Sequence, residues 1–298
     1  MSPLSPPDPA ATPPVAMTIA GSDSSGGAGI QADLRTFAAH GVHGTSAIAA
    51  LTAQNTVGVQ GVHGVPADFV VAQIESIVAD ADVGAVKTGM LGTAATVVAV
   101  ADVADRLRNL VVDPVMVAST GARLLDAGAE RAYRERLLPL ATLITPNVEE
   151  AEVLLGDRLP DRDAVVDAAG ALARTGPSVL ITGGDGGAQS VLDVMAIHTA
   201  DHIVVSVAEA PRVDTANDHG SGCSLSSSIA ARLARGERLE DASAGARAFV
   251  HRGLRGGAGW RLGAGHGPID HLGWNAPAEP SDLSPPIPIR TVDRGDAP

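Results

Sequence analysis

The sequence predicts an α/β fold in which a mostly parallel sheet is covered by helices, with an antiparallel hairpin at one edge. Three observations predict this fold. Short apolar runs alternate along the chain with longer amphipathic or alanine-rich runs, the order expected of strands and helices in a parallel sheet. The apolar runs are mostly continuous, as in strands buried on both faces. Two later runs, 191–197 and 203–208, are separated by a short polar link typical of a hairpin.

The expected elements follow in chain order. The continuous apolar runs give strands at 15–20, 46–53, 85–88, 110–116, 142–145 and 178–182. The longer amphipathic or alanine-rich runs between and after them give helices at 29–40, 67–79, 94–108, 129–138, 149–155, 162–174, 224–234 and 239–255. Each early strand is thus followed by a helix, which returns the chain to the same end of the sheet.

We expect one folded domain between two unstructured tails. A chain of 298 residues can hold one large domain or two small ones. No linker rich in Pro, Gly or Ser divides residues 15–274, which favours a single domain. The Pro-rich segments 1–14 and 275–298 cannot bury enough apolar surface to offset their ordering entropy, so we expect both to be disordered.

Charge and composition exclude several classes of partner. The net charge of −13 and the aromatic content of 2% argue against nucleic acid and anionic membranes as partners. A single cysteine, Cys223, excludes an intramolecular disulfide and a cysteine-based metal site. No apolar run approaches about 18 residues and the N-terminus lacks signal-peptide features, so we expect a cytoplasmic protein.

A glycine-rich segment, 21–29, follows the first expected strand and leads into a helix that carries Gln31 and Asp33. Glycines allow close approach of a ligand to the backbone, and a helix N-terminus favours an anion. A P-loop is excluded because no lysine follows in the required position. The alternative is an ordinary turn between a strand and a helix.

A second glycine-rich segment, 219–224, precedes a helix of small residues. Its consecutive N–H groups could form an anion hole at the helix N-terminus. Cys223 would then lie in a positive potential, which lowers the pKa of a thiol and favours the thiolate. Such a thiolate could remove a proton from a substrate hydroxyl. The alternative is that Cys223 is a small buried hydrophobic residue.

Acids and amides follow two of the expected strands. Asp113 ends one strand, and Asn147, Glu149 and Glu150 follow the next. Ligands of such sheets bind beyond the carboxyl ends of the strands, and carboxylates there suit Mg²⁺. Helix capping by Asn147 with acids in the first turn is the alternative, and we prefer it for Glu149. The turn at 182–185 could accept a nucleotide base or phosphate, although a plain turn explains it equally well.

Together these segments predict phosphoryl transfer without a P-loop, in which positioning and charge neutralisation carry the catalysis. Zinc hydrolase and α/β-hydrolase motifs are absent. The residues themselves do not name the acceptor.

Seven motifs follow one another between residues 15 and 272. They are IAGSDSSGGAGIQAD (19–33), AQNT (53–56), VKTGML (86–91), VDPVMVA (112–118), TPN with EA (145–147 and 150–151), HGSGCS (219–224) and GHGPI (265–269). In this order they resemble the hydroxymethylpyrimidine/phosphomethylpyrimidine kinases of thiamine biosynthesis. The resemblance implies a ribokinase-like three-layer α/β/α sandwich, ATP and Mg²⁺ as cofactors, a pyrimidine substrate and a homodimer.

The resemblance also implies roles for the residues that match the motifs. Asp33 and Gln54 are expected to hydrogen-bond the aminopyrimidine, with Ala28, Met90 and Val115 as its apolar walls.

The remaining implied roles concern the phosphates and the nucleotide. The expected phosphate anion hole is Gly220, Ser221 and Gly222, and Cys223 is the expected catalytic base. The expected ATP- and Mg²⁺-facing set is Asp113, Asn147, Glu150, Thr182 and Gly184, with Asp113 and Glu150 holding the metal through water.

Three positions depart from the pattern of close relatives. Thr182 and Ser119 stand where relatives commonly have lysine, and Asp218 replaces the usual threonine before the His-Gly pair. The loss of two cations near the phosphates is expected to weaken ATP binding or charge neutralisation in the transition state.

The sequence therefore predicts a kinase that phosphorylates 4-amino-5-hydroxymethyl-2-methylpyrimidine and then its monophosphate. Two alternatives stay open. One is a pyridoxal kinase, because a related ring with a hydroxymethyl group could use the same site. The other is a non-catalytic pyrimidine-binding protein, which the missing lysines would suit.

Overall fold

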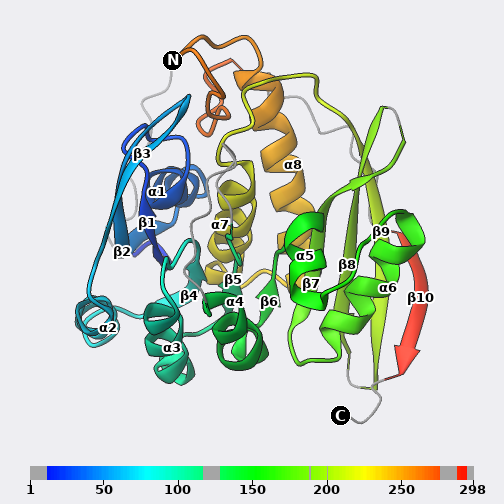
Figure 1. Ribbon diagram of the computed structural model, residues 1–298, viewed down its shortest axis with the longest axis horizontal. Coiled ribbons are helices and arrows are strands. Elements are labelled where there is room, and N and C mark those ends of the chain that lie inside the picture. Colours follow the sequence, from blue (N-terminus) through cyan, green and yellow to red (C-terminus); the bar gives the residue numbers. More distant parts are fainter. Residues whose placement is uncertain (1–11, 117–127, 188, 200, 276–286, 294–298) are drawn as a thin grey trace, which may run out of the picture.

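A ten-stranded sheet forms the middle layer of the molecule, and helices cover both of its faces (Figure 1). The computed structural model describes residues 12–116, 128–187, 189–199, 201–275 and 287–293. The strands lie side by side in the order β10-β9-β8-β7-β6-β5-β4-β1-β2-β3. This arrangement confirms the predicted α/β class.

The elements have these bounds. The strands are β1 Val15–Ser22, β2 His43–Asn55, β3 Gly58–Gly64, β4 Val83–Thr88, β5 Leu110–Val112, β6 Leu143–Ile144, β7 Ser178–Asp185, β8 Ser190–His198, β9 His202–Pro211 and β10 Ile287–Asp293. The α-helices are α1 Gly29–Ala39, α2 Ala67–Val78, α3 Ala94–Asp102, α4 Ala129–Ala132, α5 Val148–Leu155, α6 Arg162–Ala173, α7 Ser221–Ala234 and α8 Leu239–Gly257. Short 3₁₀ and π segments are η1 Ala104–Arg106, η2 Tyr133–Leu137 and η3 Leu138–Leu140.

The centre of the sheet is parallel and its two edges are antiparallel. Strands β2, β1, β4, β5, β6 and β7 pair in parallel, with Val86 opposite Leu110 and Val112 opposite Ile144. Strand β3 pairs antiparallel with β2, and β8 and β9 form the predicted antiparallel hairpin beside β7. The carboxyl ends of the parallel strands therefore meet at one edge, where the loops that follow them converge.

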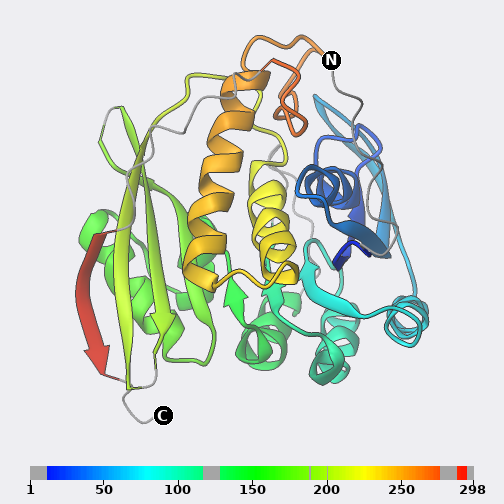
Figure 2. The same ribbon diagram turned by 180° about the vertical axis from the view of Figure 1, so that it is seen from behind.

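Alternate side chains of each strand enter two separate cores. Ala16, Ala85, Val111 and Leu143 face one core, to which α1, α7 and α8 contribute (Figure 2). The next residue of each strand faces the other core, on the side of α2 to α6. A Cβ placed on Gly84 would lie 3.1 Å from the Cα of Ala234, so α7 packs very close to β4.

The structure differs from the sequence expectations at several boundaries. The strand expected at 110–116 ends at Val112, because Pro114 has no N–H to continue a ladder. The helix expected at 94–108 ends at Asp102, and the one expected at 129–138 changes to π geometry at Tyr133. Strand β3 was not expected.

Part of the C-terminal segment is ordered, contrary to expectation. Residues Ile287–Asp293 pair antiparallel with β9 and extend the sheet beyond the hairpin. The prediction of a disordered tail at 275–298 is therefore wrong for these residues, because β9 offers an edge with free backbone groups. The other tail residues of 1–11, 276–286 and 294–298 lie outside the described residues. Within the described part of the chain, no helix is long and apolar enough to cross a membrane.

Candidate active site

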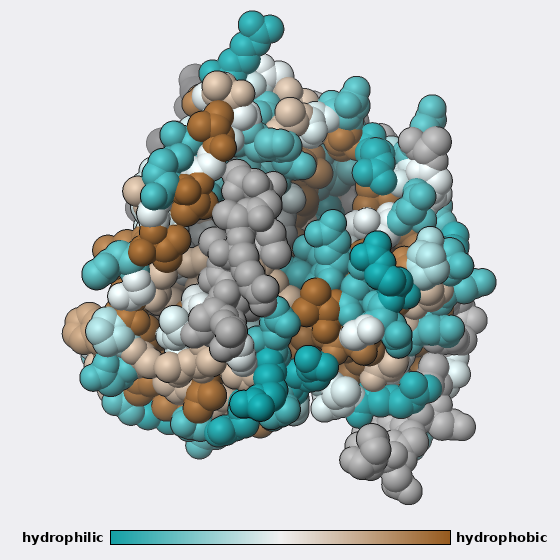
Figure 3. Space-filling model, in the orientation of Figure 1, coloured by the Kyte–Doolittle hydropathy of each residue, from teal (hydrophilic) through white to brown (hydrophobic). Residues whose placement is uncertain are grey.

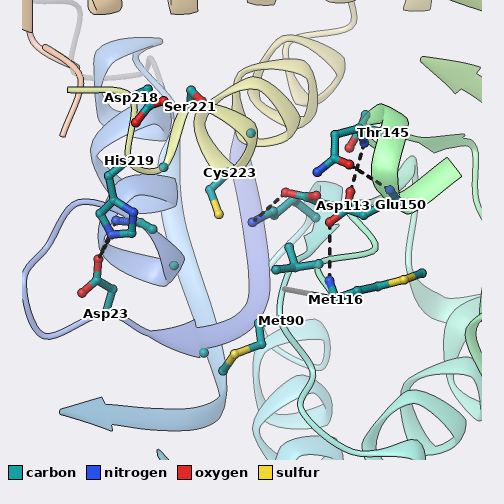
Figure 4. A pocket seen from close by; sticks show the side chains of 18 of the residues that line it. Asp23, Met90, Asp113, Met116, Thr145, Glu150, Asp218, His219, Ser221 and Cys223 are labelled. Atoms are coloured by element: carbon teal, nitrogen blue, oxygen red, sulfur yellow. Dashed lines mark hydrogen bonds and ion pairs between the residues drawn. The ribbon is translucent and has the colours of Figure 1, made fainter. Parts of the chain in front are cut away.

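A cavity of about 630 Å³ opens where the carboxyl ends of the parallel strands meet the start of α7 (Figure 4). All of the predicted site residues except Asp33 and Gly184 line it. They are Ala28, Gln54, Met90, Asp113, Val115, Asn147, Glu150, Thr182, Gly220, Ser221, Gly222 and Cys223. The topology thus brings together residues that are separated by up to 195 positions in the chain.

Two residues that the sequence analysis did not select, Asp23 and His219, tie the two glycine-rich loops together. The Nε2 atom of His219 lies 2.8 Å from Oδ2 of Asp23. The same carboxylate accepts hydrogen bonds from the N–H groups of Ser25, Gly27 and Ala28. Burial opposes the charge of Asp23, but the bonds from His219, Ser25 and Ala28 outweigh it and lower the pKa of this carboxyl to about 2.

The second glycine-rich loop forms the start of α7. Gly220 is the N-cap residue and has a φ of +78°, a conformation that favours glycine. A Cβ at this position would lie 2.0 Å from the carbonyl oxygen of Gly27, so only glycine allows the two loops to touch. The helix begins at Ser221, three residues earlier than expected. The first N–H groups of an α-helix lack intrahelical acceptors, and here they lie beside the cavity.

Cys223 lies in the first turn of α7, and its thiol points into the space between His219 and Asp113, with Met90 nearby (Figure 4). It is half-buried and lines the cavity. The expected lowering of its pKa is wrong. Burial is the largest effect and Asp113 and Asp33 add to it, so the pKa of Cys223 rises to about 12 although Lys87 and the Gly29 N–H favour the thiolate.

Asp113 and Glu150 place two buried carboxyls on the other side of the cavity. Asp113 Oδ2 accepts a hydrogen bond of 3.0 Å from Ser226 Oγ. Burial raises the pKa of Asp113 although Lys87 opposes the shift. Burial and the neighbouring Asp113 raise the pKa of Glu150 to about 8.

The Asn147 segment caps a helix and also lines the cavity. Asn147 Oδ1 accepts from the Glu150 N–H at 2.8 Å, and Glu150 Oε2 accepts from the Asn147 N–H at 3.0 Å, which is a complete capping box. Asn147, Glu149 and Glu150 also line the cavity. Capping therefore fixes the side chain of Glu150 while leaving it at the cavity wall.

Asp33 does not reach the cavity, which corrects its expected role in binding the pyrimidine. Its side chain is fully buried and forms an ion pair of 3.0 Å with Lys87 Nζ. Thr18 and Ser227 donate further hydrogen bonds to the same carboxylate, which leaves it no free acceptor for a ligand. Lys87 borders the cavity instead. Sequence reasoning could have selected Lys87 as a site residue, because it is the only lysine of the chain.

Two of the predicted pyrimidine-facing residues, Met90 and Gln54, have contacts that place them in the cavity wall. Met90 packs against Gly21, where a Cβ would lie 2.4 Å from Met90 Cε. Gln54 Nε2 lies 3.3 Å from His219 Nε2, so this amide is in contact with the pair that joins the loops. Ala28 and Val115 also line the cavity.

Of the three residues that depart from the pattern of close relatives, two line the cavity and the third lies outside the described residues. Thr182 lines the cavity, and its N–H donates to the carbonyl oxygen of Pro146 at 3.0 Å. Asp218 also lines the cavity and lies 3.0 Å from His266 Nδ1. Ser119 lies outside the described residues. Gly184 does not line the cavity, because it packs against Leu192 of β8.

A cavity at the carboxyl ends of a parallel sheet, with a helix N-terminus at one side and buried carboxyls at the other, suits a small-molecule phosphotransferase of the α/β class. The sequence model of the phosphomethylpyrimidine kinase family matches residues 23–270. The chain belongs to this family, and it has the ribokinase-like fold.

Individual relatives agree with this assignment. A hydroxymethylpyrimidine/phosphomethylpyrimidine kinase of Rhizobium meliloti is 45% identical over 87% of this chain and 97% of its own length. The thiamine biosynthesis bifunctional protein ThiED of Geobacter sulfurreducens is 45% identical over 86% of this chain, which spans 52% of that protein. The pyridoxal kinase of Staphylococcus aureus in complex with ADP has a TM-score of 0.83 at 30% identity and covers 94% of this chain and 100% of its own.

Proposed function

We propose that this protein transfers the γ-phosphate of ATP to the hydroxymethyl group of 4-amino-5-hydroxymethyl-2-methylpyrimidine and then phosphorylates the resulting monophosphate. The observation that carries the proposal is the common cavity. In it, Cys223 and the start of α7 face Gln54 and Met90 on one side and Asp113 and Glu150 on the other. Relatives with this pair of activities in their names cover nearly all of this chain.

The two sides of the cavity have separate tasks in this proposal. Gln54 hydrogen-bonds the aminopyrimidine, and Ala28, Met90 and Val115 enclose the ring. The N–H groups at Gly220–Gly222 hold the transferred phosphoryl group, whose charge is spread over its oxygens in the transition state. Asp23 and His219 fix the spacing between the two glycine-rich loops, and therefore between acceptor and phosphate.

The nucleotide side fits a magnesium ion bound mainly by phosphate oxygens and water. Among the described residues there is no cluster of three His, Cys, Asp or Glu side chains that could enclose a metal ion. Asp113 and Glu150 are buried, and burial raises the pKa of each carboxyl. Through water molecules these two carboxyls would hold a Mg²⁺ ion, which neutralises phosphate charge. Asn147 and Thr182 line the same part of the cavity.

Cys223 is the acceptor of the hydroxyl proton in this mechanism. The bond from the substrate oxygen to the γ-phosphorus forms while the bond from that phosphorus to the bridging oxygen breaks, and ADP leaves with the electron pair. The substrate proton passes to the thiolate of Cys223. Because the pKa of Cys223 is about 12 in the protein without ligands, only a small fraction is thiolate at neutral pH. That fraction grows about tenfold with each pH unit.

The test combines product analysis with a pH profile. With Mg²⁺-ATP and the hydroxymethylpyrimidine, mass spectrometry is expected to show the monophosphate and then the diphosphate. Cys223→Ala should lower kcat by at least about 100-fold, as expected for loss of a general base, and should leave the unfolding temperature nearly unchanged. In the wild type kcat/KM should rise with pH from about 7 to 10, and the variant should lack this rise. Near-wild-type turnover of the variant would refute the role of Cys223.

Pyridoxal is the second candidate acceptor. It is favoured by the similarity to solved pyridoxal kinases, one of which is a complex with pyridoxal that has a TM-score of 0.81 and 30% identity. A parallel reaction with pyridoxal separates the two candidates, because we expect the pyrimidine to give the higher kcat/KM. Binding of the pyrimidine in calorimetry without product from either acceptor would indicate a non-catalytic binding protein.

The proposed enzyme is a cytoplasmic homodimer. This proposal rests on the family and on exposed apolar side chains of β2, β3 and the turn between them, namely Leu51, Val57 and Val62. Brown side chains gather over these strands on the left of the space-filling view (Figure 3). Light scattering of the purified protein measures the mass directly, and a monomer at assay concentration would contradict the proposal.

A further inference from the structure

Lys87 is the only lysine among the 21 lysine and arginine residues of the chain. Everywhere else the protein uses arginine, which has a broad planar head that stays protonated. Lysine instead provides a compact ammonium on a slender stem. The side chain of this single lysine is fully buried and borders the cavity. A specific physical reason is therefore needed for a lysine at this position.

The surroundings of Lys87 hold its ammonium in one position. The Nζ atom lies 3.0 Å from both carboxylate oxygens of Asp33 and 4.0 Å from Oδ2 of Asp113. Asp33 is itself fixed by hydrogen bonds of 2.6 Å from Thr18 and 2.5 Å from Ser227. A Cβ on Gly89 would lie 2.7 Å from Nζ, so the backbone at residue 89 packs closely against the ammonium.

One face of α7 lies over this ammonium. Cys223, Ser226 and Ser227 are spaced by three and four residues, which places them on the same side of the helix. Ser226 donates to Asp113, and Ser227 donates to Asp33. These are the two acids that contact Lys87, so the helix face that carries Cys223 packs against the same cluster.

The pKa of Lys87 is consistent with its position beside these acids and Cys223. Burial disfavours the ammonium, but attraction to Asp33, Cys223 and Asp113 outweighs it and raises the pKa of Lys87 above its usual value. The charged and titratable groups facing Cys223 are then Lys87 from β4, Asp33 from α1, Asp113 after β5 and His219 from the loop before α7. Among Lys87, Asp33 and Asp113, Lys87 is the one that favours negative charge on sulfur.

We propose that Lys87 is a positioning residue for phosphoryl transfer, whose buried ammonium stabilises negative charge on Cys223 Sγ. The proposal rests on the proposed function, in which Cys223 accepts the hydroxyl proton. Cys223 first releases its own proton to water, and the sulfur keeps the electron pair. The substrate hydroxyl then gives its proton to this sulfur as its oxygen bonds to phosphorus. Lys87 keeps its proton throughout, and Asp33 keeps the ammonium from moving away.

The chemical reactivity of Cys223 tests this role without any kinase assay. Because Cys223 is the only cysteine, its alkylation by iodoacetamide reports the thiolate of this residue alone. At a fixed pH, Lys87→Met should slow alkylation at least about tenfold. It should also lower kcat by about 100-fold, with KM for ATP changed less than about threefold.

A second variant separates this role from a merely structural one. Lys87→Met alone leaves the carboxylate of Asp33 buried without its cation, which destabilises the fold. The double variant Lys87→Met/Asp33→Asn removes both charges, so its unfolding temperature should return toward that of the wild type. Its alkylation rate and kcat should stay low. If the double variant reacts with iodoacetamide within about twofold of the wild-type rate, Lys87 only balances Asp33 and the proposal is overturned.

A matched control is available in a second buried ion pair. Arg247 Nε lies 2.7 Å from Asp193 Oδ2, and neither residue lines the cavity. Arg247→Met/Asp193→Asn should leave the alkylation rate unchanged. A protein that phosphorylates no acceptor would contradict the proposed function, while alkylation would still show whether Lys87 acts on Cys223. An active kinase with unaltered alkylation in both double variants would contradict only the role of Lys87.

Discussion

At the scale of single residues, Asp23 shows how one side chain can hold the site together. It accepts hydrogen bonds from its own loop and from His219, which is 196 residues away in the chain. Its pKa falls from 3.8 to about 2 in the folded protein. A lowered pKa means that the contribution to stability is complete above the unfolded value and is lost as the pH falls toward 2.

This shift predicts the acid sensitivity of the fold. Between about pH 4 and pH 2 the wild type should lose about 2 kcal/mol of unfolding free energy through Asp23 alone. Asp23→Asn should be less stable at pH 7 and should show a flatter dependence in the acid range, measured by urea unfolding at each pH. Asp82→Asn is the control, because the Asp82 side chain is 88% exposed. Equal pH dependence in the wild type and Asp23→Asn would contradict the prediction.

At the scale of elements, the start of α7 depends on one backbone conformation and one close approach. Gly220 has φ +78° and touches Gly27, whereas Gly236, just after the same helix, has φ +83° with nothing within 4 Å of a built Cβ. Gly236→Ala therefore measures the conformational strain alone, about 1 kcal/mol. Gly220→Ala should destabilise by a further 1–3 kcal/mol or so, because the loops must separate.

Separation of the loops should also reduce catalysis. We expect Gly220→Ala to raise KM for ATP and lower kcat, since the N–H groups of the helix start would move away from the acceptor. Thermal unfolding and steady-state kinetics of the two alanine variants measure both effects. If the two alanine variants lose similar amounts of stability, the contact of residue 220 with Gly27 does not contribute to the stability of the fold.

At the scale of the whole molecule, the edge of the sheet formed by β8, β9 and β10 contributes to stability, whereas the chemistry takes place at the centre of the sheet. No described residue of β8, β9 or β10 lines the cavity. A chain that ends at residue 275 lacks β10 and should expose the backbone of β9. Hydrogen exchange should then speed up in β9 at residues 202–207, while β1 and β4 stay protected and kcat stays within about twofold. Unchanged exchange in β9 would contradict the pairing with β10.

The sequence predicted the larger part of the fold because local patterns encode it. The apolar strands of the parallel centre and most helices occur where expected, since burial on both faces leaves a continuous apolar run. The edge strand β3 could not be predicted, because exposed residues such as Gln60 and His63 carry no apolar pattern. Strand β10 was not predicted, because it lies in a Pro-rich segment whose average composition resembles that of disordered chains.

By itself, the sequence determined the class of fold, the two glycine-rich loops and half of the residues that line the cavity. Only the tertiary structure decided which charges meet. It paired Asp33 with the single lysine instead of with a ligand, and it joined Asp23 to His219. It also reversed the expected shift in the pKa of Cys223. The reason is physical: backbone patterns act over a few residues, whereas desolvation and ion pairing depend on which distant side chains the packed sheet brings within a few ångströms.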